Sequence, residues 1–421
     1  MFFLYRTLTI LFFPVLILIV FIRKLFGKED SKRYKEKIFV TNNDLDKNNT
    51  IWFHGASIGE IMSVIPLINN LIENNKEIKI LITTVTLSSA KIIEKKFKNN
   101  IHVTHHYFPL DVPFVIKKFL NIWRPKLVAF IDSEIWPNFL VEIKKRNIPL
   151  VLLNGRITKK TFNRWKLYKK FSNMVFSSFD ECLASSKESY ENLKQLGVKN
   201  LKYIGNLKYI SLKGEKQRLK SDTLMFLDKH KVWCAASTHK GEEEICINAH
   251  KKIKNYHDKL LTIIIPRHII RTQQIFSLCQ KNNLQVQILN NEEKINSGTE
   301  ILIINSFNQM LKYYNYCQSV FIGKSLLENL KSVAGQNPIE AAKSGCKIYH
   351  GPFVYNFSEI YEYLNKNKIA EKIQSSTELA KKITKDLKTS KSIDQEKINK
   401  INLYGEDILK KTIDIIKKNY K

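Results

Sequence analysis

The sequence contains few cysteines and no recognisable metal-binding spacing. Its six cysteines lie far apart, no Cys-x-x-Cys pair occurs, and the ten histidines include no His-Glu-x-x-His arrangement. Scattered cysteines are typical of buried thiols in a reducing compartment, so we expect a main body that is cytosolic and binds no metal. Hydrophobic residues make up 44% and charged residues 26% of the 421 positions, which excludes wholesale disorder and collagen-like or disulfide-stapled chains.

Acidic residues are also scarce. The chain has 39 Asp and Glu against 69 Lys and Arg, which gives a formal net charge of +30. An excess of this size predicts an anionic partner, such as nucleic acid, a membrane surface or a phosphorylated substrate. Dispersed lysines are also typical of an ordinary solvated surface. Because no concentrated stripe of basic and aromatic residues occurs, we expect no nucleic-acid partner.

The longest uncharged run lies near the N-terminus. Residues 7–22 (TLTILFFPVLILIVFI) carry no charge, and with residues 1–6 they are long enough for an apolar helix of about 33 Å. Pro14 is expected to kink this helix without ending the span. No small-residue cleavage site follows, as a signal peptide requires, and the basic residues from Arg23 onward favour a body on the cytoplasmic side. Residues 1–25 are therefore predicted to be a single-pass anchor; a helix buried in a soluble core is the alternative.

Beyond the anchor, short apolar strands alternate with helical patterns. Strands are predicted at residues 51–54, 78–83, 127–131, 149–153, 232–236, 261–265, 285–289, 300–304, 319–322 and 347–349. A polar, lysine-rich stretch at about residues 205–220 predicts a linker, and the lysine-rich tail from about residue 371 is expected to be helical. The alternation indicates an α/β fold with two Rossmann-like domains, residues 26–212 and 213–421, that bind ligands at the carboxyl ends of parallel strands.

In the first predicted domain, polar residues follow the strands. The loop HGASIGE leads into a helix whose N-terminus favours an ionised carboxylate at Glu60. An ionised carboxylate in a cleft is a candidate general base for a hydroxyl group, although a glutamate that only complements the helix dipole fits the same pattern. Asp132, Glu134 and Arg156 follow later strands, and Lys208 lies near the predicted linker. They either face the same cleft as Glu60 or are solvated surface charges.

In the second predicted domain, three further turns follow strands. Ser237 and Thr238 precede a helix start, an arrangement that resembles a phosphate-binding turn made of hydroxyls and free backbone N–H groups. Arg267 and His268 end the next strand and add hydrogen-bond donors at the same edge. Residues 335–340 open another helix, where Glu340 is placed to accept ribose hydroxyls while the helix N-terminus faces phosphate. Their joint placement indicates a nucleotide-linked donor substrate.

These motifs, in this order and over nearly the whole chain, carry a family resemblance. The segments are GKEDSKRYKEK, HGASIGE, YFPLDVP, RPKLVAFIDSEIWPN, NGRIT, GNLK, AASTHKGEEE, IIPRH and NPIEAAKSGCKIYHGP. With them the sequence resembles the 3-deoxy-D-manno-octulosonic acid (Kdo) transferases of lipopolysaccharide synthesis. The resemblance implies a GT-B fold, with two Rossmann-like domains facing a cleft and one N-terminal transmembrane helix in the inner membrane.

The resemblance also implies an activity and its residues. The activity is inverting transfer of Kdo from CMP-Kdo to an anionic lipid A precursor, lipid IVA, at the cytoplasmic face and among inner-membrane phospholipids, with no metal or other cofactor. Glu60 matches the catalytic base, whereas Glu134, its neighbour Asp132 and Lys208 match positions that steady the developing charge. The candidate substrate- and donor-binding residues are Ser237, Thr238, Arg267, His268, Phe307, Asn308, Gln309, Asn337, Pro338, Ile339, Glu340 and Arg156.

Four segments depart from the family pattern. Gly323-Lys324-Ser325 stands for Gly-Gly-Ser, and residues 334–338 (AGQNP) stand for Gly-Gly-His-Asn-Pro. Residues 307–310 (FNQM) replace Met-Gly-Glu-Leu, and residues 132–134 (DSE) replace Glu-Thr-Glu. Because most of these departures lie in the predicted donor half, two alternatives stay open. One is a related GT-B transferase that uses another CMP-activated keto-sugar acid, and the other is an inactive lipid-binding homologue.

Overall fold

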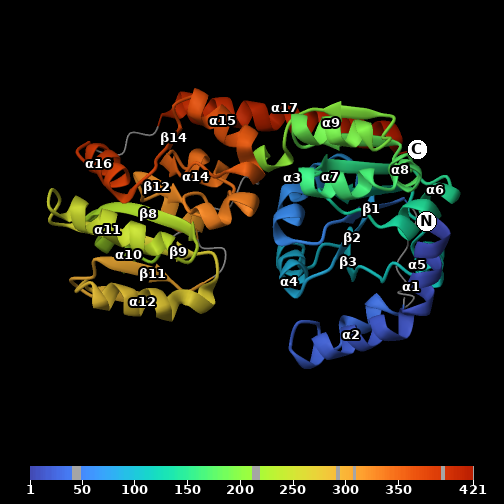
Figure 1. Ribbon diagram of the computed structural model, residues 1–421, viewed down its shortest axis with the longest axis horizontal. Helices are drawn as coiled ribbons and strands as arrows, with labels where there is room; N and C mark the ends of the chain where they lie inside the picture. Colours follow the sequence, from blue (N-terminus) through green and yellow to red (C-terminus); the bar gives the residue numbers. More distant parts are fainter. Residues whose placement is uncertain (40–48, 211–218, 291–293, 307–309, 390–393, 421) are drawn as a thin grey trace. The chain divides into compact units, whose positions relative to one another are not determined.

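The chain is divided into two units, each built on one parallel sheet. The computed structural model describes residues 1–39, 49–210, 219–290, 294–306, 310–389 and 394–420. Unit 1 comprises Met1–Leu212 with Tyr404–Lys421, and unit 2 comprises Lys213–Leu403. Helices flank the strands on both faces of each sheet (Figure 1). Of the predicted linker at about residues 205–220, residues 211–218 lie outside the described part of the chain.

The sheet of unit 1 has seven strands in the order β3-β2-β1-β4-β5-β6-β7, and every neighbouring pair is parallel. The strands are β1 (Thr50–His54), β2 (Lys79–Thr84), β3 (Val103–Tyr107), β4 (Leu127–Ile131), β5 (Leu150–Gly155), β6 (Glu181–Ala184) and β7 (Leu201–Tyr203). The helices are α1 (Phe2–Leu11), α2 (Phe13–Leu25), η1 (Arg33–Lys37), α3 (Ile58–Asn74), α4 (Leu87–Lys96), α5 (Pro113–Trp123), α6 (Pro137–Lys145), α7 (Lys159–Lys166), α8 (Lys169–Phe176), α9 (Lys187–Gln195) and η2 (Leu207–Tyr209). The order reverses between β1 and β4, which is the switch point where such sheets bind ligands.

Unit 2 repeats this architecture, with strand order β10-β11-β9-β8-β12-β13-β14 and parallel pairing throughout. The strands are β8 (Lys231–Thr238), β9 (Leu260–Pro266), β10 (Val286–Leu289), β11 (Ile301–Ile304), β12 (Ser319–Ile322), β13 (Lys347–His350) and β14 (Ala370–Lys372). The helices are α10 (Ser221–Asp228), α11 (Glu242–Lys254), η3 (Ile269–Arg271), α12 (Thr272–Lys281), α13 (Met310–Tyr314), η4 (Glu328–Val333), α14 (Ile339–Lys343), η5 (Tyr355–Phe357), α15 (Ser358–Lys366) and α16 (Ser376–Asp386). Its switch point lies between β8 and β12.

The central strands of both sheets are apolar because helices cover both of their faces. Val128, Phe130 and Trp52 are fully buried in the core of unit 1, as are Trp233 and Ile264 in the core of unit 2. Such continuous apolar runs are typical of parallel sheets. All six cysteines are buried free thiols.

The last helix, α17 (Gln395–Asn419), begins in unit 2 and ends in unit 1. The sequence places residues 404–421 in the second domain, but in the structure they group with unit 1. The ring of Tyr404 lies 4.8 Å from that of Tyr209, and a Cβ atom at Gly405 would stand 2.5 Å from the Tyr209 carbonyl oxygen. This close approach docks the end of the tail on unit 1.

The N-terminal apolar segment forms a bent pair of helices. In the described residues no single helix is both long and apolar enough to cross a bilayer, whereas α1 and α2 reach that length together with a 57° bend between them. Pro14 stands in the first turn of α2. The bend therefore falls where the sequence predicts a kink, but the predicted single transmembrane helix is not confirmed.

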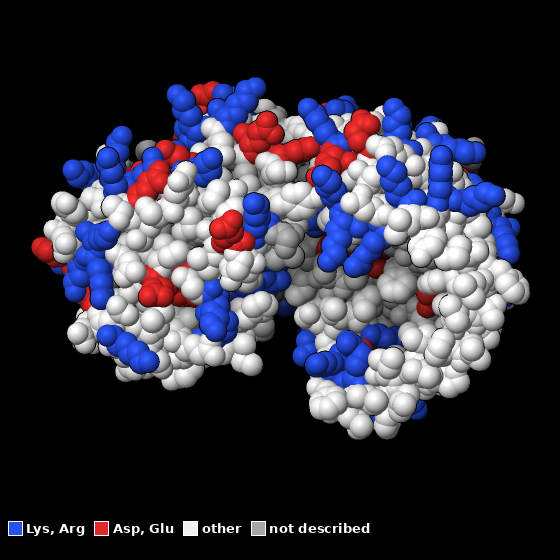
Figure 2. All heavy atoms as spheres, in the orientation of Figure 1, with Lys and Arg blue, Asp and Glu red and all other residues white. Residues whose placement is uncertain are grey.

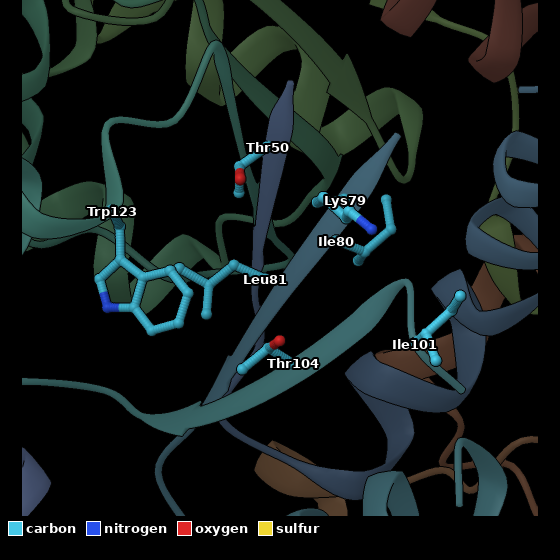
Figure 3. Close-up of a pocket in the computed structure, with 7 residues that line it drawn as sticks. All are labelled: Thr50, Lys79, Ile80, Leu81, Ile101, Thr104 and Trp123. Carbon is cyan, nitrogen blue, oxygen red and sulfur yellow. The ribbon is translucent and has the colours of Figure 1, made fainter. Parts of the chain in front are cut away.

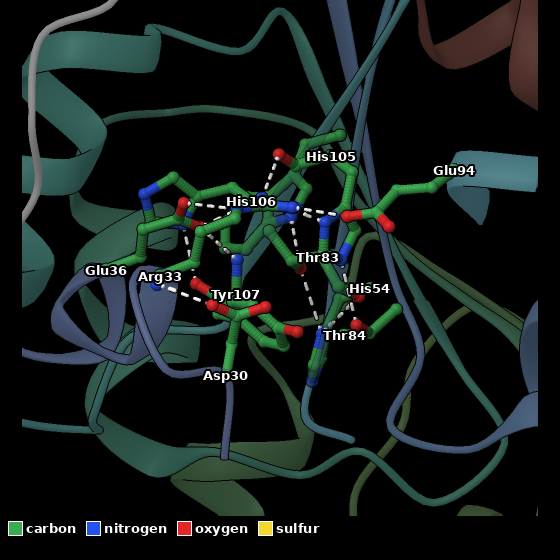
Figure 4. A network of polar contacts seen from close by, with 11 residues as sticks. Asp30, Arg33, Glu36, His54, Thr83, Thr84, Glu94, His105, His106 and Tyr107 are labelled. Carbon is green, nitrogen blue, oxygen red and sulfur yellow. Dashed lines mark hydrogen bonds and ion pairs between the residues drawn. The ribbon is translucent and has the colours of Figure 1, made fainter. Parts of the chain in front are cut away.

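The segment after α2 covers the edge of the first sheet. Arg33 donates to Glu36, to Glu94 and to the carbonyl oxygen of His105 in β3, and Glu36 accepts a hydrogen bond from the backbone N–H of Tyr107 at 2.9 Å (Figure 4). These contacts satisfy part of an exposed strand edge. They give the motif GKEDSKRYKEK a structural role.

Candidate active site

The candidate site of unit 1 lies at the switch point between β1 and β4. Glu60 stands in the first turn of α3, which follows β1, whereas Asp132 and Glu134 follow β4. Adjacent parallel strands carry these segments to the same edge of the sheet. Of the two alternatives that the sequence left open, the structure thus favours carboxylates that lie together at one edge over separate surface charges.

Glu60 is held by a capping box at the start of α3. Its Oε2 atom accepts from the backbone N–H of Ala56 at 2.7 Å and of Ser57 at 3.3 Å, and its Oε1 atom accepts from the Ser57 hydroxyl at 2.8 Å. Burial, followed by the negative charges of Asp132 and Glu134, raises the pKa of Glu60 to about 7 despite these hydrogen bonds. The prediction that the helix N-terminus keeps Glu60 fully ionised at neutral pH is therefore wrong, because burial beside two acids outweighs the helix dipole.

Asp132 is fixed by contacts from two later segments. Its backbone adopts a left-handed conformation (φ 57°), and its side chain accepts a hydrogen bond from the Asn154 amide. The amide oxygen of Asn154 accepts from the backbone N–H of Leu207 at 3.0 Å, which draws the GNLK segment to this edge. The Lys208 ammonium lies 3.6 Å from Asp132 Oδ2. Lys208 is therefore part of the site that the resemblance implies.

Glu134 is paired with a buried histidine that the sequence analysis did not single out. His54, at the end of β1, has Nε2 at 3.1 Å from Glu134 Oε2. Its Nδ1 atom lies 2.9 Å from the Thr83 hydroxyl (Figure 4). The Trp136 indole donates to the same carboxylate at 2.8 Å. Burial raises the pKa of Glu134, but the contacts from His54 and Trp136 outweigh burial and bring the pKa below its usual value. The sequence did contain a signal for this residue, because His54 is a histidine at the end of a strand that is otherwise apolar.

Arg156 reaches the same edge through its backbone, since its N–H donates to the Asp132 carbonyl oxygen at 3.0 Å.

A small cavity of about 50 Å³ lies elsewhere in unit 1. Its lining includes Thr50 and Lys79, the first residues of β1 and β2 (Figure 3). It therefore opens at the amino ends of the strands, away from the carboxylates. We assign it no function.

The candidate donor site of unit 2 lies where β8, β9 and β12 end. Thr238 is fully buried, and its hydroxyl has no hydrogen-bond partner in the part of the chain that the structure describes. The backbone N–H of Arg267 donates to the Thr238 carbonyl oxygen at 3.1 Å, which places Arg267 and His268 beside the end of β8. Both of these side chains are exposed. Ser237 has a left-handed backbone (φ 57°), and its hydroxyl lies 3.7 Å from Met310 Sδ.

One backbone N–H of the turn after β8 is already occupied, and the phosphate contact that the sequence predicts for this turn stays a prediction. The Glu242 carboxylate, fully buried at the start of α11, accepts from the backbone N–H groups of His239, Lys324, Ser325 and Leu326 at 2.7–3.2 Å. Glu242 thus occupies the His239 N–H of the predicted phosphate turn, and it ties the loop after β12 to the loop after β8. The Arg271 guanidinium binds Glu243 through two parallel hydrogen bonds and fixes the segment after Arg267 and His268.

We expect Glu242→Ala to destabilise unit 2 by at least about 3 kcal/mol, because it leaves several buried N–H groups without an acceptor. Urea denaturation measures the change. Glu244→Ala is the matched control, since Glu244 is an exposed residue of the same helix turn, and a change within about 0.5 kcal/mol is expected for it. Equal stability of the two variants would contradict this role of Glu242.

Glu340 stands in the first turn of α14, and burial raises its pKa. Asn337 caps this turn by accepting from the backbone N–H of Ile339 at 3.1 Å, and Pro338 precedes the helix. α14 is a short helix of 5 residues, and the phosphate contact that the sequence predicts at its N-terminus stays a prediction. Phe307, Asn308 and Gln309 lie outside the described residues. In the described chain no group of three or more His, Cys, Asp or Glu side chains could hold a metal ion, and metal independence stays a prediction.

Comparisons with known proteins show which family the chain resembles. Residues 32–211 match the family model described as 3-deoxy-D-manno-octulosonic-acid transferase (kdotransferase). A 3-deoxy-D-manno-octulosonic acid transferase of Rickettsia bellii is 32% identical over 89% of this chain and 88% of its own length. The protein of that name from Haemophilus influenzae is 27% identical over 92% of each chain.

Solved structures show the same fold at low identity. A UDP-GlcNAc 2-epimerase from Neisseria meningitidis, bound to UDP-GlcNAc, is 11% identical and covers 88% of this chain and 99% of its own, with a TM-score of 0.55. At that identity the likeness shows the fold alone, two Rossmann-like units of the GT-B type.

Proposed function

Because the chain belongs to the family of 3-deoxy-D-manno-octulosonic acid (Kdo) transferases, we propose that it transfers Kdo from CMP-Kdo to a lipid A precursor, lipid IVA, in lipopolysaccharide synthesis. The observation that carries the proposal is Glu60, a carboxylate with a pKa of about 7 at the switch point of the first sheet. A base is most effective when its pKa lies near the working pH. The acidic neighbours Asp132 and Glu134 help to set that value.

In the proposed reaction, Glu60 accepts the proton of a sugar hydroxyl on the acceptor. The acceptor oxygen then forms a bond to the anomeric carbon of Kdo while the bond from that carbon to the CMP phosphate breaks. CMP leaves with the electron pair, and a single in-line displacement inverts the anomeric configuration. Lys208, close to Asp132, supplies a positive charge at the same edge of the sheet as Glu60. It steadies the negative charge that develops in the transition state.

Unit 2 holds the donor in this proposal. Glu340, which is half-buried and whose pKa is raised by burial, accepts ribose hydroxyls, and Arg267, with no ion-pair partner among the described residues, meets the phosphate. Thr238, whose buried hydroxyl has no partner among the described residues, ends β8 at the same edge of the sheet. Guanidinium groups bind phosphate oxygens well, so the leaving CMP is stabilised without a metal ion.

The test is CMP release by the purified protein, given CMP-Kdo or CMP-sialic acid, with and without lipid IVA and with EDTA present. We expect release only when CMP-Kdo and the lipid are both present, and no effect of EDTA. Faster release from CMP-sialic acid would favour a transferase of another keto-sugar acid. Binding of CMP and lipid with no release from either donor would favour an inactive homologue.

The raised pKa of Glu60 predicts a pH dependence. Below pH 7 the carboxyl group is mostly protonated and cannot accept the hydroxyl proton, so kcat/KM is expected to fall about tenfold per pH unit from pH 6 downward. Above pH 8, kcat/KM is expected to depend no further on the ionisation of Glu60. Initial rates from pH 5 to pH 9 provide the measurement. A rate that stays constant down to pH 5 would contradict Glu60 as the base.

We further propose that α1 and α2 attach the protein to the cytoplasmic face of the inner membrane. Much of this pair is apolar and exposed, including Phe3 (81%), Leu11 (69%) and Leu25 (70%). Figure 2 shows a largely uncharged surface over α1 and α2, with basic side chains gathered at one end. Arg23 and Lys24 in the last turn of α2 suit anionic lipid head groups.

Polar contacts hold α1 on the body of unit 1. Tyr5 donates to Asp111 at 2.7 Å, Arg6 pairs with Glu142 at 3.0 Å, and the Asn138 amide donates to Thr9 at 3.1 Å. These contacts favour a pair of helices that enters one leaflet over a helix that crosses the bilayer alone.

Replacing Phe3, Leu11 and Leu25 together with glutamate is expected to weaken binding to vesicles of phosphatidylethanolamine and phosphatidylglycerol at least tenfold. Co-sedimentation measures the bound fraction. Ile101→Glu is the control, because Ile101 is equally exposed (79%) but lies outside these helices. Unchanged binding of the triple variant would contradict attachment through α1 and α2.

A further inference from the structure

Lys324 stands at the switch point of the second sheet. It follows β12 (Ser319–Ile322), which pairs with β8, and Thr238 ends β8 at the same edge. On the other side of β8, strand β9 ends at Pro266 and is followed by Arg267. Ligands of open α/β sheets bind in the crevice where the strand order reverses.

The backbone around Lys324 is fixed on both sides. Its N–H donates to Glu242 Oε2 at 2.7 Å, and its carbonyl oxygen accepts from the Gly335 N–H, also at 2.7 Å. The preceding residue, Gly323, lies so close to β8 that a Cβ atom there would stand 2.7 Å from the Ser237 carbonyl oxygen. The position of Lys324 in the loop is therefore determined by its neighbours.

Lys324 also adopts a left-handed backbone conformation, with φ of 57°. This conformation is costly for a residue with a Cβ atom, whereas glycine adopts it without strain. Strained positions cluster at ligand-binding sites, where the function of the side chain compensates for the cost. A lysine at such a position is therefore a candidate for a functional side chain.

The Lys324 ammonium contributes to a positive edge of the sheet. Burial lowers the pKa of His239, and the charges of Lys324 and His268 lower it further, so these groups are within electrostatic range. The rings of His239 and His268 lie 5.7 Å apart. Of the neighbouring carboxylates, Glu242 accepts from backbone N–H groups and Glu243 is bound by Arg271. Lys324 and Arg267 thus stand at the same edge of the sheet, after the two strands that flank β8.

We propose that Lys324 binds the phosphate group of the sugar-nucleotide donor, together with Arg267. The inference rests on the proposed function, because it assumes a CMP-linked donor in unit 2. It adds a contact from a residue at which the family pattern has glycine and no side chain.

The test compares Lys324→Gly with Lys368→Gly by isothermal titration with CMP and with cytidine. Lys368 is the matched control, since it has the same left-handed backbone (φ 54°) and is exposed, but it lies just before β14 at the amino end of that strand. We expect Lys324→Gly to weaken CMP binding at least fivefold and to leave cytidine binding unchanged. Neither Lys324→Gly nor Lys368→Gly is expected to lower the melting temperature of the protein. Lys324→Arg is expected to retain most of the CMP affinity.

Equal CMP affinity of wild type and Lys324→Gly would overturn the inference, as would an equal loss in Lys368→Gly. A raised KM for CMP-Kdo with unchanged CMP affinity would also overturn it, because the contact would then be to the sugar carboxylate. These outcomes leave the proposed function standing. If the wild-type protein binds no CMP, the proposed function and this inference both fail.

Discussion

Glu60→Gln is expected to lower the rate of transfer by about 10²–10⁴-fold while CMP binding stays unchanged. Glutamine keeps the size of the side chain and one acceptor oxygen for the backbone of Ala56 and Ser57, but it cannot take a proton from the acceptor hydroxyl. Glu73→Gln is the matched control, because Glu73 is an exposed residue of the same helix. Full activity of Glu60→Gln, or loss of CMP binding, would contradict the role of Glu60.

Glu60→Gln is also expected to change the free energy of unfolding, which can be measured without an activity assay. The pKa of Glu60 rises from 4.5 to about 7 on folding, so the folded protein favours the protonated form and loses stability as the pH rises through 7. Glutamine lacks this charge. We therefore expect Glu60→Gln to be more stable than wild type by about 1–3 kcal/mol at pH 8, with the difference disappearing near pH 4. Denaturant titrations at the two pH values measure it.

Arg267→Ala is expected to weaken CMP binding by about 10–100-fold, the loss typical of a charge-assisted hydrogen bond to phosphate. Because the side chain is exposed and makes no ion pair among the described residues, folding is expected to be unaffected. Isothermal titration with CMP provides the measurement, and circular dichroism checks the fold.

Lys259→Ala is the control for Arg267→Ala. Lys259 is also an exposed cation and stands just before β9, at the opposite end of the strand that Arg267 follows. Unchanged CMP affinity of Arg267→Ala would contradict a contact between Arg267 and the phosphate of the donor. An equal loss in both variants would show a general effect of net charge and no local contact.

The central strands of both units could be predicted from the sequence because they are continuous apolar runs. The strands at residues 51–54, 127–131 and 319–322 are found at β1, β4 and β12 with nearly the predicted limits. The strands that the sequence analysis missed are short or mixed in polarity, namely β3 (VTHHY), β6 (ECLA), β7 (LKY) and β14 (AEK). They pair with strands that are distant in sequence or stand at sheet edges, and local patterns do not report such pairing.

The candidate site was predicted in part. The grouping of Glu60, Asp132 and Glu134 could be predicted as one alternative because they follow strands that meet at one edge, whereas Lys208 was assigned to the site only through the family resemblance. The ionisation state of Glu60 could not be predicted, because its pKa depends on burial and on charges that come from another loop.

Three buried polar residues were assigned no role for the same reason. His54 pairs with Glu134, Asn154 joins Asp132 to Leu207, and Glu242 gathers backbone N–H groups from two loops. Each partner lies far away in the sequence, so only the folded chain shows the contact.

Mass spectrometry of lipid IVA after incubation with the full-length protein and CMP-Kdo tests the central claim most directly. The account predicts a mass increase of one or more Kdo units with wild type and at least a hundredfold slower increase with Glu60→Gln. A lipid of unchanged mass, from a folded protein that binds CMP, would contradict the claim that this chain is an active Kdo transferase.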